Sequence, residues 1–204
     1  MLFRSIAWYD RTGQRISAVT SGNLARDRGA ALAPDGKRIA FTAAAPAGNT
    51  LWLQEPGSSA PSQLPFAAST VDFPVWSSDG RWLFFSAGKN RAHDRLVRMD
   101  TATFSKTDIV VTGGTDLVAS GVSPDGKTLL YRDVDPKEGH LIWTLTMDQP
   151  NAKPVLFAKT KPRPWTAQFS PDARWVAYPS PERGIVVESF PPQPSQVPGF
   201  GYRR

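Results

Sequence analysis

Cysteine is absent from the 204-residue sequence, and histidine occurs only twice, at His93 and His140. Without cysteine the chain has no disulfide scaffold, no thiolate metal site and no cysteine nucleophile. The sequence also lacks the G-x-S-x-G pentad that presents a serine nucleophile on a strand-to-helix turn. The two histidines occupy near-equivalent places of a repeat described below, so repetition explains both, and without a fixed carboxylate partner they make a poor zinc site. We therefore predict that the chain is not an enzyme and has no catalytic residue, no metal site and no cofactor.

Long apolar runs are also missing. Turn and charged residues interrupt every apolar stretch before it reaches the roughly 18 to 20 residues needed to cross a bilayer, so we predict no membrane insertion. A secretory signal requires a basic start followed by an apolar run of roughly 7 to 15 residues. The first ten residues, MLFRSIAWYD, break such a run at Arg4, Ser5 and Asp10. We expect no signal peptide in this chain.

The residues that are present can build a core. Apolar residues make up 40% of the chain and aromatic residues 11%, which is too many for a disordered chain. The length predicts one domain, or at most two. Lys and Arg total 24 against 18 Asp and Glu, and the resulting charge of +6 permits binding to a polyanion without requiring it. Most aromatics fall inside apolar runs rather than among basic residues, so we predict no nucleic-acid binding.

One segment occurs four times without gaps. The copies are ALAPDGKRIAFT (31–42), VWSSDGRWLFFS (75–86), GVSPDGKTLLYR (121–132) and QFSPDARWVAYP (168–179). Their turn residues are Asp35 and Gly36, Asp79 and Gly80, Asp125 and Gly126, and Asp172. The aspartates are spaced by 44, 46 and 47 residues. In such a turn proline fixes φ, the short aspartate side chain accepts hydrogen bonds from the turn backbone, and glycine adopts a positive φ. Ser78 replaces the proline in the second copy, and Ala173 replaces the glycine in the fourth, where a positive φ costs more and the turn is free to differ.

Each turn leads into a short apolar or aromatic strand, and a second such strand follows about fifteen residues after the aspartate. A weaker fourth strand follows in three of the copies. Four strands in a period of about 45 residues is typical of a β-propeller blade. We predict an all-β propeller of four-stranded antiparallel blades, with about four full blades plus a half blade. The expected units are a half blade at 5–20 and blades at 28–66, 70–112, 117–158 and 164–199.

At the turns the sequence resembles the TolB-type, WD40-like propeller repeat, whose signature is S-P-D-G-K/R before an apolar strand. Residues 123–127 match it completely, and residues 77–81 and 170–172 match it in part. Such propellers also occur at the C-terminal ends of some bacterial Ser/Thr kinases and in prolyl oligopeptidase-type enzymes. The resemblance implies a non-catalytic scaffold or sensor that binds a protein or peptide, in the periplasm or elsewhere outside the cytoplasm. The alternative it leaves open is the propeller of a prolyl oligopeptidase-type hydrolase without its catalytic domain.

Propellers of this type usually close a ring of about six or more blades, so we predict an incomplete ring. Because a blade contacts only its neighbours, an incomplete ring exposes sheet faces and edges at both ends. Of three interpretations of the incomplete ring, we favour the one in which the sequence is a piece of a longer chain. The other two interpretations are a small ring closed by unusual strand pairing and a ring completed by a second copy of the chain. The exposed end blades predict self-association.

Candidate binding residues lie at and after the turns. One base follows each turn, at Lys37, Arg81, Lys127 and Arg174, and together they would form a partial positive ring on one face for an acidic partner. The alternative is that these bases keep the hairpin tips soluble. Trp165 lies in a blade connection and is the aromatic expected at a channel mouth. For the turn aspartates we favour hydrogen bonding within the turn over a shared cation site.

Overall fold

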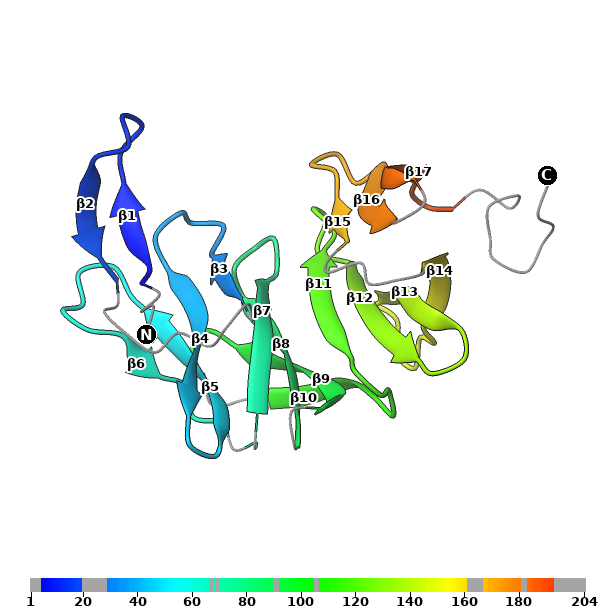
Figure 1. The fold of residues 1–204 in the computed structure, drawn as a ribbon, viewed down its shortest axis with the longest axis horizontal. Helices are drawn as coiled ribbons and strands as arrows, with labels where there is room; N and C mark the ends of the chain where they lie inside the picture. The colour runs from blue at the N-terminus through cyan, green and yellow to red at the C-terminus, as the bar shows by residue number, and fades with distance from the viewer. Residues whose placement is uncertain are drawn as a thin grey trace.

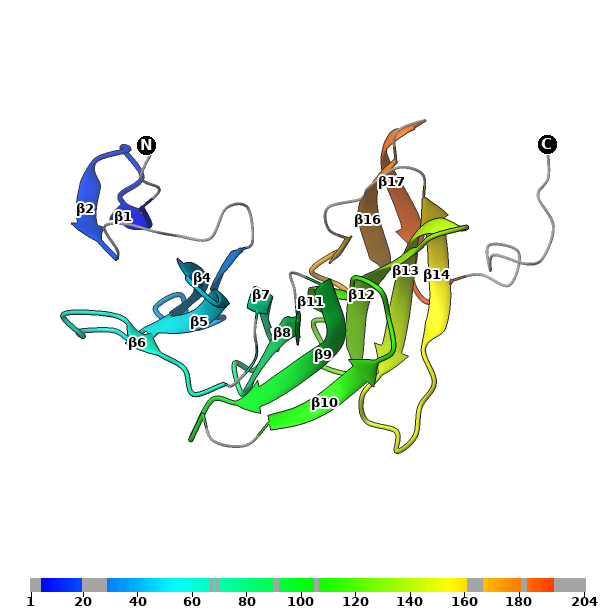
Figure 2. The same cartoon turned by 60° about the horizontal axis from the view of Figure 1, so that its bottom comes forward.

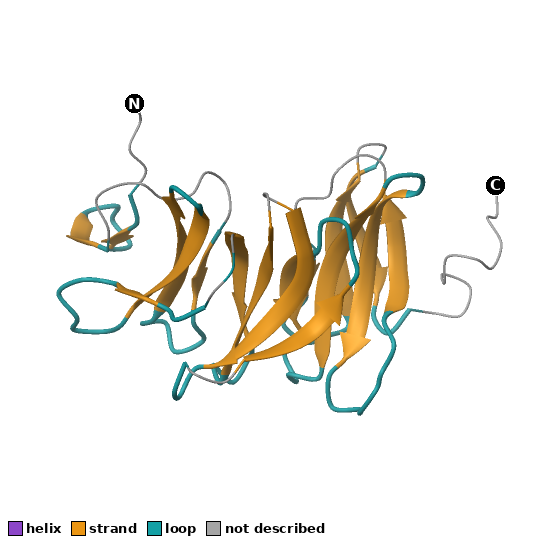
Figure 3. Ribbon diagram, turned by 90° about the horizontal axis from the view of Figure 1, so that it is seen from below, coloured by secondary structure: helices purple, strands orange, loops and turns teal. Residues whose placement is uncertain are grey.

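The computed structural model describes residues 5–19, 29–66, 68, 70–89, 92–104, 107–160, 167–180 and 183–192. Every regular element in this part of the chain is a β-strand (Figure 3). It contains no helix long and apolar enough to span a membrane. Parts of four predicted units lie outside the described residues. They are residue 20 of the half blade, residue 28 of the blade at 28–66, residues 90–91 and 105–106 of the blade at 70–112, and residues 164–166, 181–182 and 193–199 of the blade at 164–199.

The strands form five antiparallel sheets. The first is a hairpin of β1 (Ala7–Tyr9) and β2 (Arg15–Ala18). The second contains β3 (Ala30–Leu32), β4 (Ile39–Ala45), β5 (Gly48–Gln54) and β6 (Ser62–Gln63). The third contains β7 (Thr70–Trp76), β8 (Trp82–Lys89), β9 (Ala92–Asp100) and β10 (Thr107–Thr112). The fourth contains β11 (Val118–Val122), β12 (Thr128–Asp135), β13 (Gly139–Thr146) and β14 (Val155–Thr160), and the fifth contains β15 (Gln168–Phe169), β16 (Trp175–Ser180) and β17 (Gly184–Ser189).

The sheets follow one another along an open arc (Figures 1 and 2). In each sheet the strands are paired in chain order, as in a propeller blade. The first strands of the sheets contact one another, since β7 touches both β3 and β11, and β11 touches β15. The β1–β2 hairpin and the β15–β17 sheet lie at opposite ends of the arc (Figure 1). The predicted all-β propeller with an incomplete ring is therefore confirmed.

The core lies between the sheets, in four apolar clusters. Successive side chains of a strand point to opposite faces, so each of the three inner sheets contributes to two clusters. In β8, Leu83 and Phe85 pack toward the β3–β6 sheet, whereas Phe84 packs toward the β11–β14 sheet. All three side chains are almost completely buried. This double burial explains why the apolar runs after the turns are continuous rather than alternating.

The four repeat turns have the same backbone geometry. The residue after the aspartate has φ values of 68°, 69°, 75° and 58° at Gly36, Gly80, Gly126 and Ala173. Its N–H donates to the carbonyl three residues earlier at 2.8–3.0 Å in all four turns. The fourth turn thus keeps the geometry of the others although alanine replaces glycine, and Ala173 carries the backbone strain.

Replacing Ala173 by glycine is expected to raise the free energy of unfolding by about 1 kcal/mol. The substitution removes about 1–2 kcal/mol of strain from the left-handed backbone conformation. Part of this gain is offset, because glycine has more conformational entropy than alanine in the unfolded chain. Urea unfolding measures the change. The matched variant is Gly36→Ala, where a Cβ meets no atom within 4 Å, so only the positive φ opposes it. The free energy of unfolding of Gly36→Ala should fall by a similar amount. If both variants were as stable as the wild type, the backbone at Ala173 would not be strained.

Candidate functional site

The repeat turns gather on one surface, which we call the turn face. It comprises residues 33–38, 77–82, 123–128 and 170–175. The first two turns touch, because Arg38 Nη2 donates to the carbonyl of Gly80 at 3.4 Å. The second and third also touch, because a Cβ built at Gly126 would lie 3.3 Å from Ser78 Oγ. The first three turns, which are more than 40 residues apart in sequence, thus form a continuous row.

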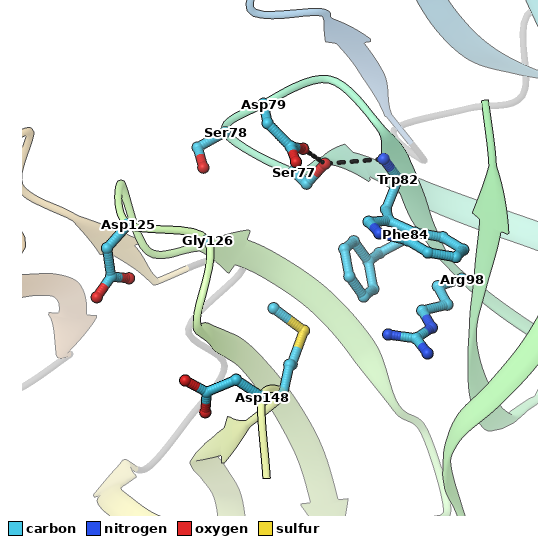
Figure 4. Close-up of a pocket in the computed structure, with 10 residues that line it drawn as sticks. Ser77, Ser78, Asp79, Trp82, Phe84, Arg98, Asp125, Gly126 and Asp148 are labelled. Atoms are coloured by element: carbon cyan, nitrogen blue, oxygen red, sulfur yellow. Dashed lines mark hydrogen bonds between the residues drawn. The ribbon is translucent and has the colours of Figure 1, made fainter. Parts of the chain in front are cut away.

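Within the turns, serine and aspartate share one hydrogen-bond pattern. Ser77 Oγ donates to Asp79 Oδ1 at 2.6 Å and accepts from the N–H of Trp82 at 2.8 Å (Figure 4). Ser123 and Ser170 repeat both bonds in the third and fourth turns. The serine of the S-P-D-G signature therefore joins the aspartate to the first residue of the following strand. In the first turn alanine stands at this position, and Asp35 instead accepts from the N–H and the Nε of Arg38.

These bonds lower the pKa of each turn aspartate. The backbone N–H of Arg38, followed by its side chain, lowers the pKa of Asp35 to about 2. The hydrogen bond from Ser77 lowers the pKa of Asp79, and that from Ser123 lowers the pKa of Asp125. The hydrogen bond from Ser170 is likewise the largest cause of the lowered pKa of Asp172. Each turn therefore carries a negative charge that its own donors hold in place.

The four predicted binding bases are exposed on this face. Arg81 places its guanidinium 5.3 Å from the centroid of the Trp82 ring. Lys127 Nζ lies 4.0 Å from Asp148 Oδ2, and Arg174 Nε lies 2.7 Å from Asp172 Oδ2. Lys37 is joined to its turn through its backbone N–H, which donates to Asp35. The row therefore carries carboxylates beside the bases, so its charge is mixed. Trp165 lies outside the described residues.

A groove opens on the turn face between the β7–β10 and β11–β14 sheets (Figure 4). Its volume is about 250 Å³. It is lined by Ser77, Ser78, Asp79, Trp82, Phe84, Arg98, Asp125, Gly126, Met147 and Asp148, which we call the turn groove. Trp82, Phe84 and Arg98 come from one sheet and face Asp148 across the opening (Figure 4).

The groove combines an apolar floor with a charged rim. Trp82 and Met147 pack at the edge of the buried cluster that joins the two sheets. The Arg98 guanidinium lies 4.5 Å from the centroid of the Trp82 ring, and its Nη2 is 3.1 Å from Asp108 Oδ2. A guanidinium held in this way is fixed in position and still offers donors to a ligand.

A second polar cluster lies at the strand ends away from the turns. His93, the second residue of β9, is 1% exposed and lies between two carboxylates. Its Nε2 is 2.9 Å from Asp72 Oδ2, and its Nδ1 is 2.7 Å from Asp116 Oδ1. Asp116 Oδ2 in turn accepts from Arg132 Nη2 at 3.2 Å, and Asn49 Nδ2 donates to Asp72 Oδ1 at 2.6 Å. We call these five residues the inter-sheet network, because they join three successive sheets.

The geometry of the inter-sheet network favours the imidazolium form of His93. A neutral imidazole carries one N–H, whereas both ring nitrogens here face a carboxylate oxygen. Burial by itself lowers the pKa of His93, but the hydrogen bonds with Asp116 and Asp72 outweigh it, so the pKa is raised above 6.5. A charged side chain enclosed in this way links sheets and is not accessible to a substrate.

Stability is therefore expected to fall as the pH rises. A raised histidine pKa contributes stabilisation that is complete below the unfolded-state pKa of about 6.5 and is lost as pH passes through the folded-state pKa. Urea unfolding at pH 6, 7, 8 and 9 measures this slope. The variant His93→Gln should flatten this slope, because glutamine binds no proton in this pH range. The same slope in both proteins would contradict this role of His93.

Sequence reasoning did not find the inter-sheet network. His93 and His140 are each the second residue of a third strand, as their spacing implied. Their surroundings differ, because only His93 lies between two aspartates, whereas His140 Nδ1 lies 3.3 Å from Arg132 Nη1. Asp72 and Asp116 are 21 and 23 residues from His93, and no local spacing signals the contact. Among the described residues, no group of three or more histidine and carboxylate side chains could hold a metal ion.

The structure is that of a β-propeller, because the sheets follow one another in an open series, their first strands contact one another, and the same turn recurs in each of four sheets.

No family model matches the sequence, and no curated protein matches it. Solved structures do match. TolB from Acinetobacter baumannii has a TM-score of 0.71 at 17% identity, covering 88% of this chain and 44% of that one. The fold is that of a TolB-like β-propeller.

Two other matches widen the comparison. A chain of the nidogen/laminin complex has a TM-score of 0.65 at 13% identity, over 85% of this chain and 65% of that one. A protein assigned as a 6-phosphogluconolactonase from Bacteroides fragilis has a TM-score of 0.59 at 14% identity, over 91% of this chain and 60% of that one. The chain thus spans less than two thirds of the length of each of these proteins. Since they include a protein complex and an assigned enzyme, the likeness shows the fold alone.

Proposed function

We propose that the chain is a non-catalytic module that binds a protein or peptide through its turn face, as a scaffold or sensor. The observation that carries this proposal is the turn groove. Its floor of Trp82, Phe84 and Met147 lies within a rim of carboxylates and the fixed guanidinium of Arg98. Protein interfaces are enriched in aromatic, methionine and arginine side chains at their centre and are polar at their rim.

The exposed bases extend this binding surface. Lys37, Arg81, Lys127 and Arg174 supply positive charges along the row of turns, and the turn aspartates supply negative charges beside them. A surface of mixed sign selects a partner by the arrangement of its charges, since like charges placed opposite each other are costly. Trp165 is proposed as a further contact. The nidogen/laminin complex supports a polypeptide partner, because there a chain of this fold occurs in a protein complex.

We propose an extracytoplasmic, periplasmic location for the module. The support is the likeness of its fold to the TolB structures. Fusion of alkaline phosphatase to the complete gene product tests it, because this reporter is active only where its disulfides form. Activity is expected, and an inactive fusion of full length would contradict the location.

Peptide selection tests the binding function. Random dodecapeptides displayed on phage are selected on the purified chain, and the selected peptides are titrated by calorimetry. The variant Ser78→Lys places a long side chain in the groove and is expected to weaken binding at least tenfold. The matched control Pro171→Lys adds the same side chain at the equivalent position of the fourth turn, outside the groove. It should leave the affinity unchanged.

Two results would overturn the proposal. Equal affinity of the selected peptides for the wild type and Ser78→Lys would exclude the groove as the binding site. Hydrolysis of 6-phosphogluconolactone by the purified chain would exclude a non-catalytic role, and this substrate is chosen because two assigned lactonases share the fold.

A further inference from the structure

The side chains that line the turn groove carry more negative than positive charge. Asp79, Asp125 and Asp148 are exposed, and Arg98 is the one cation among the described residues that line the groove. Arg98 is already paired, because its Nε and its Nη2 each lie 3.1 Å from Asp108 Oδ2, and Asp108 is outside the lining. The groove is therefore a negative site on a chain whose net charge is +6.

The turn carboxylates at the groove differ from those of the other two turns in their second oxygen. In the fourth turn Arg174 Nε donates to Asp172 Oδ2 at 2.7 Å, and the first turn has the equivalent bond at 2.6 Å. In the second and third turns Oδ1 accepts from the serine hydroxyl and from a turn N–H. No side-chain donor of the described residues bonds to Oδ2 of Asp79 or of Asp125, so both oxygens can accept from a ligand.

The shape of the groove fits one long side chain. Its volume of about 250 Å³ is below the roughly 300–1,000 Å³ of a typical small-molecule site. Trp82 and Met147 are the partly buried residues of its apolar floor. Asp125 and Asp148 lie on one side of the opening and Trp82 on the other (Figure 4). A side chain with an aliphatic stem and a cationic end matches this arrangement, because its stem packs on apolar surface while its charge stays at the rim.

We propose that the turn groove binds a lysine or arginine side chain of a peptide partner. The inference rests on the proposed function, because it names the residue that the peptide places in the groove. The aliphatic stem packs on Trp82 and Met147, and the charged end donates to Asp125 and Asp148. Arg98 donates to a backbone carbonyl of the peptide, which needs no charge of its own. The bases outside the groove leave acidic groups acceptable elsewhere on the same partner.

The base beside Asp148 does not close the groove. Lys127 Nζ is 4.0 Å from Asp148 Oδ2, and the exposed fractions of the two side chains are 62% and 49%. An ion pair this exposed contributes little, so a ligand cation can take the place of the lysine.

The peptides selected on the purified chain test this inference. They are expected to share a lysine or an arginine, whereas general attraction to a chain of charge +6 would enrich acidic peptides. Replacing that arginine by citrulline, or that lysine by norleucine, removes the charge and nearly keeps the shape. Calorimetry should show binding weakened about tenfold by this replacement. Affinity for the unmodified peptide should also fall when sodium chloride is raised from about 50 to about 500 mM, because salt screens exposed charges.

Substitution of Asp148 tests the position of the ligand charge. Asp148→Asn should weaken binding about threefold, as expected for a partly exposed ion pair, and Asp148→Lys about tenfold, because like charges then face each other. The matched control is Asp94→Asn, which removes a similarly exposed carboxylate of β9 that does not line the groove. It should leave the affinity unchanged.

Failure of this inference and failure of the proposed function give different results. Selected peptides that Ser78→Lys weakens but that bind without a basic residue would overturn the cationic ligand and leave the proposed function intact. Tighter binding of the selected peptides to Asp148→Lys would do the same, because it would show an acidic ligand in the groove. If no peptide were selected, or if Ser78→Lys bound the selected peptides like the wild type, the proposed function and this inference would both be wrong.

Discussion

Replacing His93 by alanine is expected to lower the free energy of unfolding by about 3–5 kcal/mol, the usual cost of removing one partner from a buried ion pair. Asp72 is completely buried, and His93 supplies the charged donor to its Oδ2. In the variant, Asp72 keeps the neutral donors Asn49 and Thr70 but loses the opposite charge. Asp116 loses its contact across the sheets at the same time. The variant therefore weakens the junction between the β7–β10 and β11–β14 sheets.

Urea unfolding of three variants tests this expectation. His140→Ala is the matched control, since His140 holds the same strand position and is only half-buried, and it should cost about 1 kcal/mol or less. The double variant His93→Ala/Asp72→Asn should recover part of the loss, because it removes the uncompensated carboxylate. Equal losses in His93→Ala and His140→Ala would show that the bridge between the two carboxylates contributes little.

Replacing Gly88 by alanine is expected to lower the free energy of unfolding by about 3 kcal/mol, at the upper end of the usual cost of overpacking. A Cβ at this position would lie 1.8 Å from the carbonyl oxygen of Ala92 and 3.0 Å from the Cα of His93. These are backbone atoms of the paired strand β9, so no side-chain rotation relieves the contact. Strand β9 would have to move away from β8 and carry His93 with it.

The control for this substitution is Gly121→Ala in β11. A Cβ there would meet only the carbonyl oxygen of Ala167, at 4.0 Å, and alanine restricts the unfolded chain more than glycine does. Its stability should equal or slightly exceed that of the wild type. Thermal unfolding followed by circular dichroism compares the two variants, and equal stability of Gly88→Ala and Gly121→Ala would contradict the close approach of β8 and β9.

The fold could be predicted because its determinants are local and repeated. The turn at Asp125 and Gly126 needs only a few neighbouring residues to form, and the apolar run that follows it indicates a strand buried on both faces. Regular spacing then implies blades. The serine of the turn was recognised as part of a signature, but its double hydrogen bond became clear only from the positions of Asp79 and Trp82.

The candidate site was predictable only in part. The exposure of Lys127 and Arg174 follows from their place at hairpin tips. Of the carboxylates beside them, Asp172 lies in the same turn as Arg174 and is visible in the sequence. Asp148, which follows the C-terminal end of β13, comes close to Lys127 only in the folded sheet. The turn groove likewise needs two sheets, since Trp82 and Asp148 face each other only when the blades are assembled.

By itself the sequence determined the all-β class, the position of each turn, the blade period and the open ring, because these depend on short-range backbone preferences and on strand periodicity. Tertiary structure alone decided that His93 lies between Asp72 and Asp116 and that a groove opens between two sheets. Each of these depends on how neighbouring sheets are placed against each other. That placement is set by the packing of many side chains from distant segments, and no local pattern encodes it.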